Sequence, residues 1–347
     1  MTTKNYPKQA SDSIVLTGSH EDLKVLLIKR KNDPYRGLWA FPGGFIEKEE
    51  EAYFAAKREL LEETGLDLKE LIGLPLTKRK KKGRDPRGEV ESFPFLFYKA
   101  DLEKMGVRGM DDALEAKWVP LRNIEELAFD HGAILCEALG FFWGGFFGKE
   151  DGKELEKVAL PFFLEKGRSL LKNLNERVVF FGGSFNPWHR GHQACLDLCV
   201  ADNVIVVPDT NPFKVKGFNY QVCFWKAFKK MALEMEETSY GFFPGFFGRE
   251  EVNPTAGWFI NVPFYEKGLL VGDDSFFQLE TWSDSENLLA SVSYIYVAPR
   301  NHSQQELEIE GARLKVSFPH IGIFILSDHD YQKESSTTLR KKTRGAF

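Results

Sequence analysis

Three glutamates stand close together on one predicted helix. Glu59, Glu62 and Glu63 are spaced i, i+3 and i+4, and residues at these spacings share one face of an α-helix. Three like charges on one face repel one another unless a cation compensates them. Hard divalent cations such as Mg²⁺ prefer carboxylate and phosphate oxygens. The spacing therefore predicts a metal site for a phosphate-bearing substrate, against the alternative of a solvated acidic helix face.

A second group of residues predicts a separate phosphate site. Residues 177–181 (RVVFF) read as a buried strand that leads into the string GGSFNPWHRGH. A strand that runs into a glycine turn and a helix start presents backbone N–H groups to phosphate. His189 and His192 flank Gly191 at this turn, so both imidazoles are expected to face a triphosphate and to stabilise a leaving pyrophosphate. The loop residues assigned to this site are Gly182, Gly183 and Ser184.

The acidic helix is predicted to belong to a first α/β unit. It covers Glu51–Thr64, and Gly65 is placed to act as its C-cap. The β-rich stretch Ser13–Ile28 predicts the two strands of a hairpin. Two further strands and a helix are expected over residues 93–98, 116–119 and 124–139.

The glycine turn is predicted to belong to a second α/β unit. The strand at 177–181, a helix over 192–199 and a strand over 204–207 follow a βαβ pattern, which implies a parallel, right-handed crossover. A chain of 347 residues is also expected to have more than one core. The predicted divisions are a first domain over 1–140, a connector over 141–175 and a second domain over 176–347.

The composition is typical of a globular protein, with 43% hydrophobic and 28% charged residues. The formal net charge of -5 gives no general attraction to nucleic acid. The start of the chain lacks the apolar segment of a secretory signal, and no apolar run approaches the roughly 20 residues of a membrane helix. The four cysteines form no CxxC pair, and Cys195 and Cys199 are expected to be buried. We therefore expect a cytoplasmic protein without nucleic-acid or membrane partners; a homo-oligomer is left open.

The first unit resembles the Nudix hydrolases. Residues 44–66 (GFIEKEEEAYFAAKRELLEETGL) fit the pattern GX5EX7REUXEEXGU at every specified position. The resemblance implies an α/β/α sandwich with a mixed sheet, and hydrolysis of an X-linked nucleoside diphosphate. It also implies that Mg²⁺, or Mn²⁺ in its place, is held by the three helix glutamates. Two further residues, Glu50 and Arg58, would hold and orient them.

Three short segments narrow the expected substrate of this unit. Residues 30–44 (RKNDPYRGLWAFPGG), 83–89 (GRDPRGE) and 127–131 (LAFDH) resemble the ADP-ribose pyrophosphatases and the related Nudix sensors that regulate NAD genes. The resemblance makes ADP-ribose the expected ligand. The basic run at 78–82 is expected to be a solvated hairpin loop beside the site, because the whole chain is acidic.

The second unit resembles the nucleotidyltransferase superfamily. Residues 208–214 (PDTNPFK), 272–282 (GDDSFFQLETW) and 335–340 (SSTTLR) are similar, in order, to segments of the nicotinate-mononucleotide adenylyltransferases. A Rossmann-like parallel sheet is implied, as is adenylyl transfer from ATP to nicotinate or nicotinamide mononucleotide with Mg²⁺ bridging. Asn186 departs from the aspartate that is commoner in the bacterial enzymes, which leaves the choice of pyridine open.

This second resemblance also assigns residues. Asp274 is expected to hold the adenosine ribose, and Trp282 to stack near the pyridine ring unless it is a core tryptophan. The residues expected to contact the phosphates of ATP are His189, His192, Lys214, Ser336, Thr337 and Arg340.

Two intact catalytic patterns in one chain predict a bifunctional enzyme of pyridine-nucleotide metabolism. One alternative makes the Nudix domain a ligand sensor that regulates the transferase, although a pure sensor has no need of metal-binding carboxylates. Another joins a house-cleaning Nudix domain to a cytidylyl- or pantetheine-type transferase, which the GxDxxxxLxxW match disfavours. A DNA-binding regulator is least favoured, because the second half predicts a nucleotide-binding βαβ unit rather than a helix-turn-helix.

Overall fold

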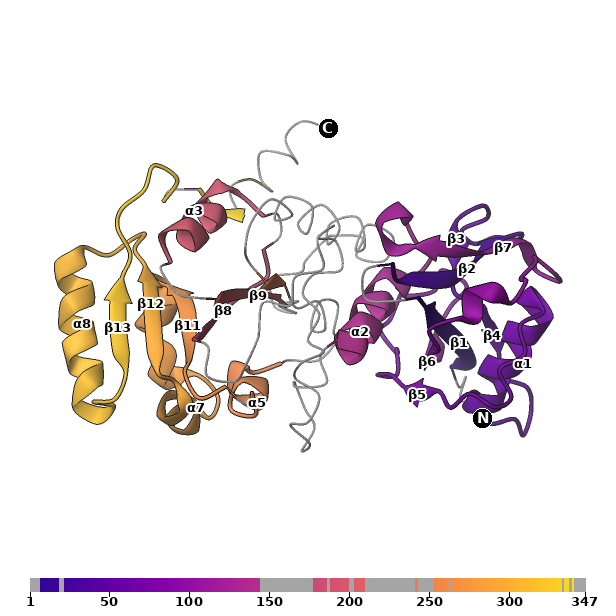
Figure 1. Ribbon diagram of the computed structural model, residues 1–347, viewed down its shortest axis with the longest axis horizontal. Coiled ribbons are helices and arrows are strands. Elements are labelled where there is room, and N and C mark those ends of the chain that lie inside the picture. The colour runs from indigo at the N-terminus through magenta and orange to yellow at the C-terminus, as the bar shows by residue number, and fades with distance from the viewer. Residues whose placement is uncertain are drawn as a thin grey trace, which may run out of the picture. The chain divides into compact units, whose positions relative to one another are not determined.

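The computed structural model describes residues 7–18, 22–143, 177–185, 188–199, 203–209, 241–242, 253–262, 264–332, 334–336 and 339. They fall into two compact units, one with the described residues up to Leu139 and one with those from Gly140 onward (Figure 1). The exact bounds of the two domains and of the connector stay a prediction. No helix in the described part of the chain has both the length and the apolar character to cross a membrane.

The first unit is built on a mixed seven-stranded sheet. The order β3-β2-β1-β6-β5 is extended by β4, which pairs with β1, and by β7, which pairs with β2. β1 is antiparallel to β2 and parallel to β6, so the predicted hairpin and mixed sheet are confirmed. The strands are β1 (Lys8–Thr17), β2 (Lys24–Arg30), β3 (Trp39–Ala40), β4 (Gly43–Phe45), β5 (Leu74–Pro75), β6 (Val90–Tyr98) and β7 (Ala113–Pro120).

Helix α1 (Ala52–Thr64) covers this sheet with a small apolar face. Ala55, Ala56 and Leu60 are buried, and the Ser13 hydroxyl donates to the Ala56 carbonyl at 2.8 Å. Gly65 ends the helix in the left-handed conformation, with φ of 73°, as its expected role as C-cap requires. The contact of Ser13 with α1 and the end of the helix at Gly65 together determine which face of α1 packs on the sheet and which carries the glutamates.

Helix α2 (His131–Trp143) differs from the helix expected over 124–139. The short 3₁₀ helices of this unit are η1 (Leu102–Lys104) and η2 (Leu121–Asn123). After η2 the chain runs along β3, where the Ala128 N–H donates to the Trp39 carbonyl at 2.8 Å. Because this pairing uses the backbone of the segment before His131, the helix begins later than its apolar pattern suggests. It also extends into the first three residues of the predicted connector.

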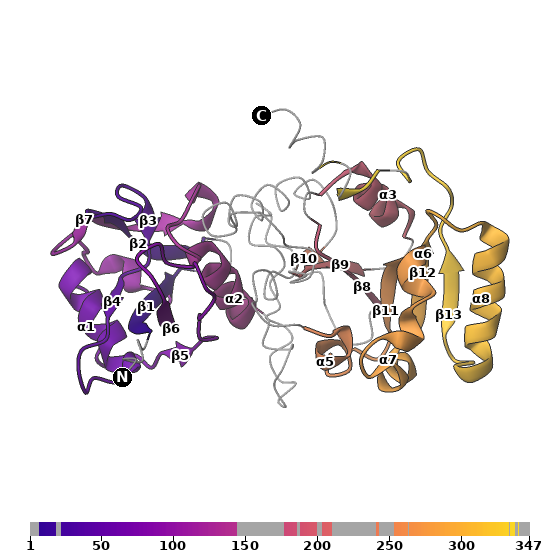
Figure 2. The same cartoon turned by 180° about the vertical axis from the view of Figure 1, so that it is seen from behind.

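The second unit contains a six-stranded sheet whose strands are all parallel, in the order β10-β9-β8-β11-β12-β13 (Figure 2). The predicted Rossmann-like parallel sheet is therefore confirmed. Its strands are β8 (Val178–Gly183), β9 (Asn203–Pro208), β10 (Gly241–Phe242), β11 (Lys267–Gly272), β12 (Tyr294–Ala298) and β13 (Gly322–Ile325). Its helices are α3 (Arg190–Leu198), α5 (Thr255–Phe259), α6 (Asp273–Phe276), η4 (Leu279–Thr281), α7 (Ser285–Ser291) and α8 (Gln304–Ser317).

Local sequence explains the ends of these elements. Helix α8 begins with a capping box. The Glu306 backbone N–H donates to the Ser303 hydroxyl oxygen, and the Ser303 backbone N–H donates to the Glu306 carboxylate. Gly268 lets β11 approach β12, because a Cβ there would lie 2.7 Å from the Tyr294 carbonyl oxygen. In a parallel sheet the carboxyl ends of the strands meet at one edge, where ligands bind. The loops that follow β8, β11 and β12 therefore share that edge.

Candidate active sites

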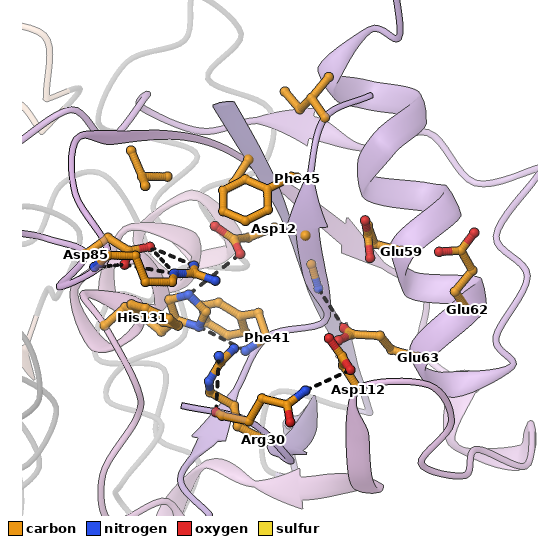
Figure 3. Close-up of a pocket in the computed structure, with 18 of the residues that line it drawn as sticks. Asp12, Arg30, Phe41, Phe45, Glu59, Glu62, Glu63, Asp85, Asp112 and His131 are labelled. Carbon is orange, nitrogen blue, oxygen red and sulfur yellow. Dashed lines mark hydrogen bonds and ion pairs between the residues drawn. The ribbon is translucent and has the colours of Figure 1, made fainter. Parts of the chain in front are cut away.

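The three glutamates of α1 line a cavity of about 410 Å³ in the first unit. Figure 3 shows Glu59, Glu62 and Glu63 along one side of this cavity, with Asp85 and His131 across from them. The structure therefore places the carboxylates that the spacing had grouped along one wall of a cavity. Glu50 does not line the cavity itself but is tied to it through Arg58.

Glu63 is the most deeply buried of the three, with 4% of its surface exposed. It accepts a hydrogen bond from the Gly43 N–H at 2.9 Å. Burial raises the pKa of Glu63 to about 8 despite this hydrogen bond. Burial likewise raises the pKa of Glu59 above its usual range. Burial thus favours the neutral form of both carboxylates. A bound cation would offset the cost of keeping them charged.

Gly44 explains how Glu59 can lie against the backbone of β4. A Cβ added at Gly44 would stand only 2.3 Å from the Glu59 carboxyl carbon. Only a residue without a side chain leaves that space for the carboxylate. The glycine of the pattern therefore forms part of the cradle for Glu59.

Arg58 holds the outer part of the cluster. Its Nε and Nη2 donate to the two oxygens of Glu50 at 2.9 and 2.8 Å, the bidentate geometry that fixes a guanidinium best. Its Nη1 donates to Glu59 at 2.8 Å and to Glu62 at 3.1 Å. The hydrogen bonds from Arg58 hold the pKa of Glu50 below its usual range. Arg58 therefore links Glu50 to Glu59 and Glu62.

The donor set fits a hard divalent cation. It offers carboxylate oxygens alone, from one helix, with one carboxylate desolvated and one resting on a glycine. Mg²⁺ and Mn²⁺ both suit such oxygens. Glu59, Glu62 and Glu63 are the residues that would hold the ion.

The opposite wall joins two motifs that the sequence had left separate. Arg84 donates from Nε and Nη2 to Asp130 at 2.9 and 2.6 Å, across 46 positions. His131 accepts the Phe41 N–H at its Nδ1 at 3.0 Å and stacks on the Phe41 ring, with the centroids 4.8 Å apart. The segments GRDPRGE and LAFDH are thus in contact on one wall of the cavity. Their resemblance to known motifs marked each segment, but the sequence did not show that the two are in contact.

The basic run at 78–82 is solvated only in part: Lys80, Lys81 and Lys82 are exposed, but Arg79 is not. Arg79 is 1% exposed and forms a buried ion pair with Glu137 of α2. Lys78 pairs with Glu91 at 2.6 Å closer to the surface. The expectation was wrong for Arg79 because a carboxylate from another element supplies its counter-charge.

In the second unit, Gly182 and Gly183 are the last residues of β8 rather than loop residues, paired with Val207 and Pro208 of β9. Ser184 follows the strand, and α3 begins at Arg190. The strand, turn and helix therefore follow the order that a phosphate site of this kind requires.

His189 and His192 lie together at the start of α3. Their ring centroids are 3.6 Å apart, with 24° between the planes. Burial lowers the pKa of both, that of His192 to about 3. The Nδ1 atoms of both are buried and have no hydrogen-bond partner among the described residues. The pair is therefore neutral near pH 7 and retains polar atoms for a ligand.

Gly191 is required between the two histidines. A Cβ there would meet the His189 ring and the Tyr331 carbonyl oxygen, each at 3.0 Å. The segment after β13 thus returns to α3, where the His329 Nε2 also lies 4.0 Å from the Cys195 sulfur. Cys195 and Cys199 are buried, as expected.

Asp274 lies at the start of α6, directly after β11 and beside a fully buried aspartate. Asp273 accepts the backbone N–H groups of Arg300 and His302, both at 2.9 Å, and so ties the end of β11 to the end of β12. Asp274 itself accepts from the Asn301 amide at 3.2 Å. Asp274 is therefore held at the carboxyl edge of the sheet, where a ribose ligand was expected.

The remaining assigned residues differ in what the structure says of them. Trp282 is half-buried and packs against the core of the second unit, which favours the core role. Ser336 is helical, and nearby the Leu339 N–H donates to the Ser335 carbonyl at 3.0 Å. Three others, Lys214, Thr337 and Arg340, lie outside the described residues, as does Asn186.

Arg300 is a residue that motif reading missed. It follows β12, and its charge lowers the pKa of both His189 and His192 after the larger effect of burial. A lone arginine after a strand carried no signal in the sequence. Arg300 lies near the two histidines because the carboxyl ends of β12 and β8 are at the same edge of the sheet.

Comparison with known proteins gives matches to both halves. The NUDIX domain model matches residues 7–137. An ADP-ribose pyrophosphatase of Methanocaldococcus jannaschii is 42% identical over 132 residues, 38% of this chain and 72% of that protein. The ADPR responsive transcriptional repressor NtrR of Acinetobacter baylyi is 32% identical over 142 residues, 38% of this chain and 53% of the repressor. A probable nicotinate-nucleotide adenylyltransferase of Borreliella burgdorferi is 28% identical over 179 residues, 48% of this chain and 83% of that protein.

Proposed function

The chain belongs to the Nudix family, and from this premise we propose that its first unit hydrolyses ADP-ribose to AMP and ribose 5-phosphate. The observation that carries the proposal is the row of three carboxylates on α1, one of them desolvated, lining a cavity of about 410 Å³. The pyrophosphatase relative supports the choice of ADP-ribose.

Each residue of this site has a part in the reaction. Glu59, Glu62 and Glu63 hold the cation, and the Gly43 N–H keeps Glu63 in place at 2.9 Å. Bound Mg²⁺ supplies Lewis-acid polarisation and neutralises the charge that develops on the diphosphate. A water oxygen adds to one phosphorus, the bond from that phosphorus to the bridging oxygen breaks with its electron pair going to the departing phosphate, and the proton that the water loses passes to solvent. Arg58 and Glu50 keep the carboxylates of Glu59 and Glu62 in position throughout.

A sensor is the second candidate for the first unit, because one relative is an ADPR responsive repressor. The chain spans 53% of that protein's length. The intact set of Glu50, Glu59, Glu62 and Glu63 favours hydrolysis, since a pocket that only binds ADP-ribose gains nothing from a cradle that holds carboxylates for a metal.

The second unit, in the same proposal, transfers an adenylyl group from ATP to nicotinate or nicotinamide mononucleotide. The mononucleotide's phosphate oxygen attacks the α-phosphorus of ATP, and pyrophosphate leaves with the bonding electrons. The stacked neutral pair His189 and His192 at the start of α3 supports this role, as does the adenylyltransferase relative. Lys214, Ser336, Thr337 and Arg340 are proposed to share the triphosphate, and Asp274 the ribose. The ligands proposed for the whole chain are thus small nucleotides.

One experiment separates the two activities. The purified chain is incubated with ADP-ribose, and separately with ATP and each mononucleotide, with Mg²⁺ or with EDTA, and products are resolved by chromatography. Glu63→Gln should lose only hydrolysis, and His192→Asn only transfer. Binding of ADP-ribose without turnover would favour the sensor, and absence of transfer to either mononucleotide would remove the second half of the proposal.

A further inference from the structure

Asp273 is a fully buried carboxylate at the junction of β11 and α6. Its Oδ1 accepts the backbone N–H of Asp274 at 2.8 Å. Its Oδ2 accepts three consecutive backbone N–H groups of the loop that follows β12, those of Arg300, Asn301 and His302. The Nδ1 of the His302 ring lies 3.1 Å from the same oxygen. One side chain thus fastens the loop after β12 to the end of the neighbouring strand β11.

The three N–H groups of this loop form an anion site that Asp273 fills. Successive backbone N–H groups that converge on one point make a concave site for an anion. Burial by itself would raise the pKa of Asp273, but the hydrogen bonds from Asn301, His302 and Arg300 outweigh it and hold the pKa below its usual range. The possible ligand atoms of Asp273, Asp274 and His302 lie within 4.8 Å of one another. Because the Oδ2 of Asp273 already accepts the loop, this cluster anchors backbone rather than a cation.

Arg300 is the charged side chain that this loop carries near the histidine pair. It is exposed and follows β12 at the edge of the sheet where β8 also ends. Its charge contributes to lowering the pKa of both His189 and His192, after the larger effect of burial. No carboxylate oxygen in the described part of the chain lies within 4.0 Å of its guanidinium, whereas the equally exposed Arg313 of α8 pairs with Glu310 at 2.6 Å. The N–H groups of Arg300 are therefore open to a ligand at this edge.

We propose that Asp273 is a positioning residue of the second unit. The loop that it holds presents Arg300 to the phosphate groups of a nucleoside triphosphate, beside His189 and His192. This inference rests on the proposed adenylyl transfer and adds a fixed cation to that site. The two imidazoles are neutral near pH 7, so Arg300 supplies charge that they lack. A loop that is fixed before the ligand arrives loses less conformational freedom on binding.

Calorimetric titration of ATP into the whole chain, with EDTA present, tests the role of Arg300 without a metal. Arg300→Gln should weaken ATP binding by about tenfold, the range of one charged hydrogen bond, and Arg300→Lys should retain part of the affinity. Any ATP that the first unit binds is common to all these chains. With Mg²⁺, the KM for ATP should rise by a similar factor, while kcat and the KM for the mononucleotide change much less. Arg313→Gln is the matched control and should bind ATP as the unchanged chain does.

Asp273→Asn tests whether the buried carboxylate acts through Arg300. If it does, this variant should lose about as much ATP affinity as Arg300→Gln, and the double variant should lose no more than either single one. Additive losses would overturn the positioning role. If Asp273→Asn fails to fold by circular dichroism, Asn301→Pro, which removes one N–H donor at an exposed residue, takes its place in the same comparison.

The result for Arg300 also separates this inference from the proposed function. Unchanged ATP affinity in the folded Arg300→Gln chain would overturn the inference even if adenylyl transfer occurs. Binding of ATP that depends on Arg300, without transfer to either mononucleotide, would support the inference and overturn the proposed transferase.

Discussion

The imidazole of His192 stacks on that of His189, with 3.6 Å between ring centroids. Two imidazolium ions could not share this arrangement, because like charges at such a distance repel strongly. Burial lowers the pKa of each ring; at His189 the charge of Glu334 opposes this effect and that of Arg300 adds to it, and at His192 the charges of His189 and Arg300 both add to it. The pair is therefore neutral near pH 7, so cationic charge for the proposed triphosphate must come from other residues.

Replacing His192 should change how the second unit responds to acid. The pKa of His192 is about 3 in the folded chain, below the 6.5 of an unperturbed histidine. Between these values the unfolded chain binds the extra proton, so stability is fully present above about pH 6.5 and falls as the pH drops toward 3. His192→Asn should therefore lose less stability between pH 7 and 5 than the unchanged chain. Urea unfolding of the second unit at both pH values measures this, and equal losses would contradict it.

Gly44→Ala should disable hydrolysis without unfolding the chain. The new methyl group would stand 2.3 Å from the Glu59 carboxyl carbon, so the carboxylate must move. A displacement of about 1 Å at a catalytic group costs on the order of 100-fold in rate. Steady-state hydrolysis of ADP-ribose measures the loss. Gly106→Ala is the control, because no atom lies within 4 Å of a Cβ at that exposed position; a similar loss there would show that the effect is not local.

Glu63→Gln should remove the response of the first unit to Mg²⁺. A ligand at about 100 times its dissociation constant stabilises a fold by roughly 2.7 kcal/mol. The unchanged chain should therefore melt at a higher temperature with saturating Mg²⁺ than with EDTA, whereas the variant should show little shift. The variant should also hydrolyse ADP-ribose at least about 1000-fold more slowly, given the several kcal/mol that a catalytic metal supplies.

Glu70→Gln is the matched control for this carboxylate, since Glu70 is exposed and does not line the cavity. It should keep both the thermal shift and the turnover. A Glu63→Gln chain that still responded fully to Mg²⁺ would show that the ion is held elsewhere.

Arg79→Met should destabilise the first unit through α2. Arg79 and Glu137 are 1% and 2% exposed at their side chains, so the substitution leaves a buried carboxylate unpaired. Such a loss costs about 3–5 kcal/mol, whereas a surface pair contributes about 0–1 kcal/mol. Lys78→Met removes the more exposed pair with Glu91 and provides the comparison. Denaturant unfolding that gave equal effects for the two variants would contradict the buried pair's role.

The row of glutamates on α1 could be predicted because it is local in sequence. Glu59, Glu62 and Glu63 fall on one helix face by spacing alone, and Gly65 ends that helix where a glycine is expected. The strand–turn–helix around His189 is local in the same way. Patterns within a few turns of chain determine such groups, whatever the rest of the fold does.

The opposite wall could not be predicted, because its contacts join distant segments. Arg84 meets Asp130 across 46 positions, and Phe41 meets His131 across 90. The late start of α2 has the same cause: the residues before His131 are helix-compatible, yet Ala128 pairs with Trp39 instead. Arg79 was expected to be solvated because no carboxylate near it in sequence could pair with it. Glu137 of α2 supplies that carboxylate.

The return of the segment after β13 to Gly191 sets an order of events during synthesis. His329 approaches Cys195 across 134 positions, so the turn that carries His189 leaves the ribosome well before the chain that closes over it. At about 5–20 residues per second, that interval is on the order of ten seconds. The first unit needs no such wait, because the residues that line its cavity all come earlier in the sequence. A nascent chain should therefore be able to carry out the proposed hydrolysis before it can carry out the proposed adenylyl transfer.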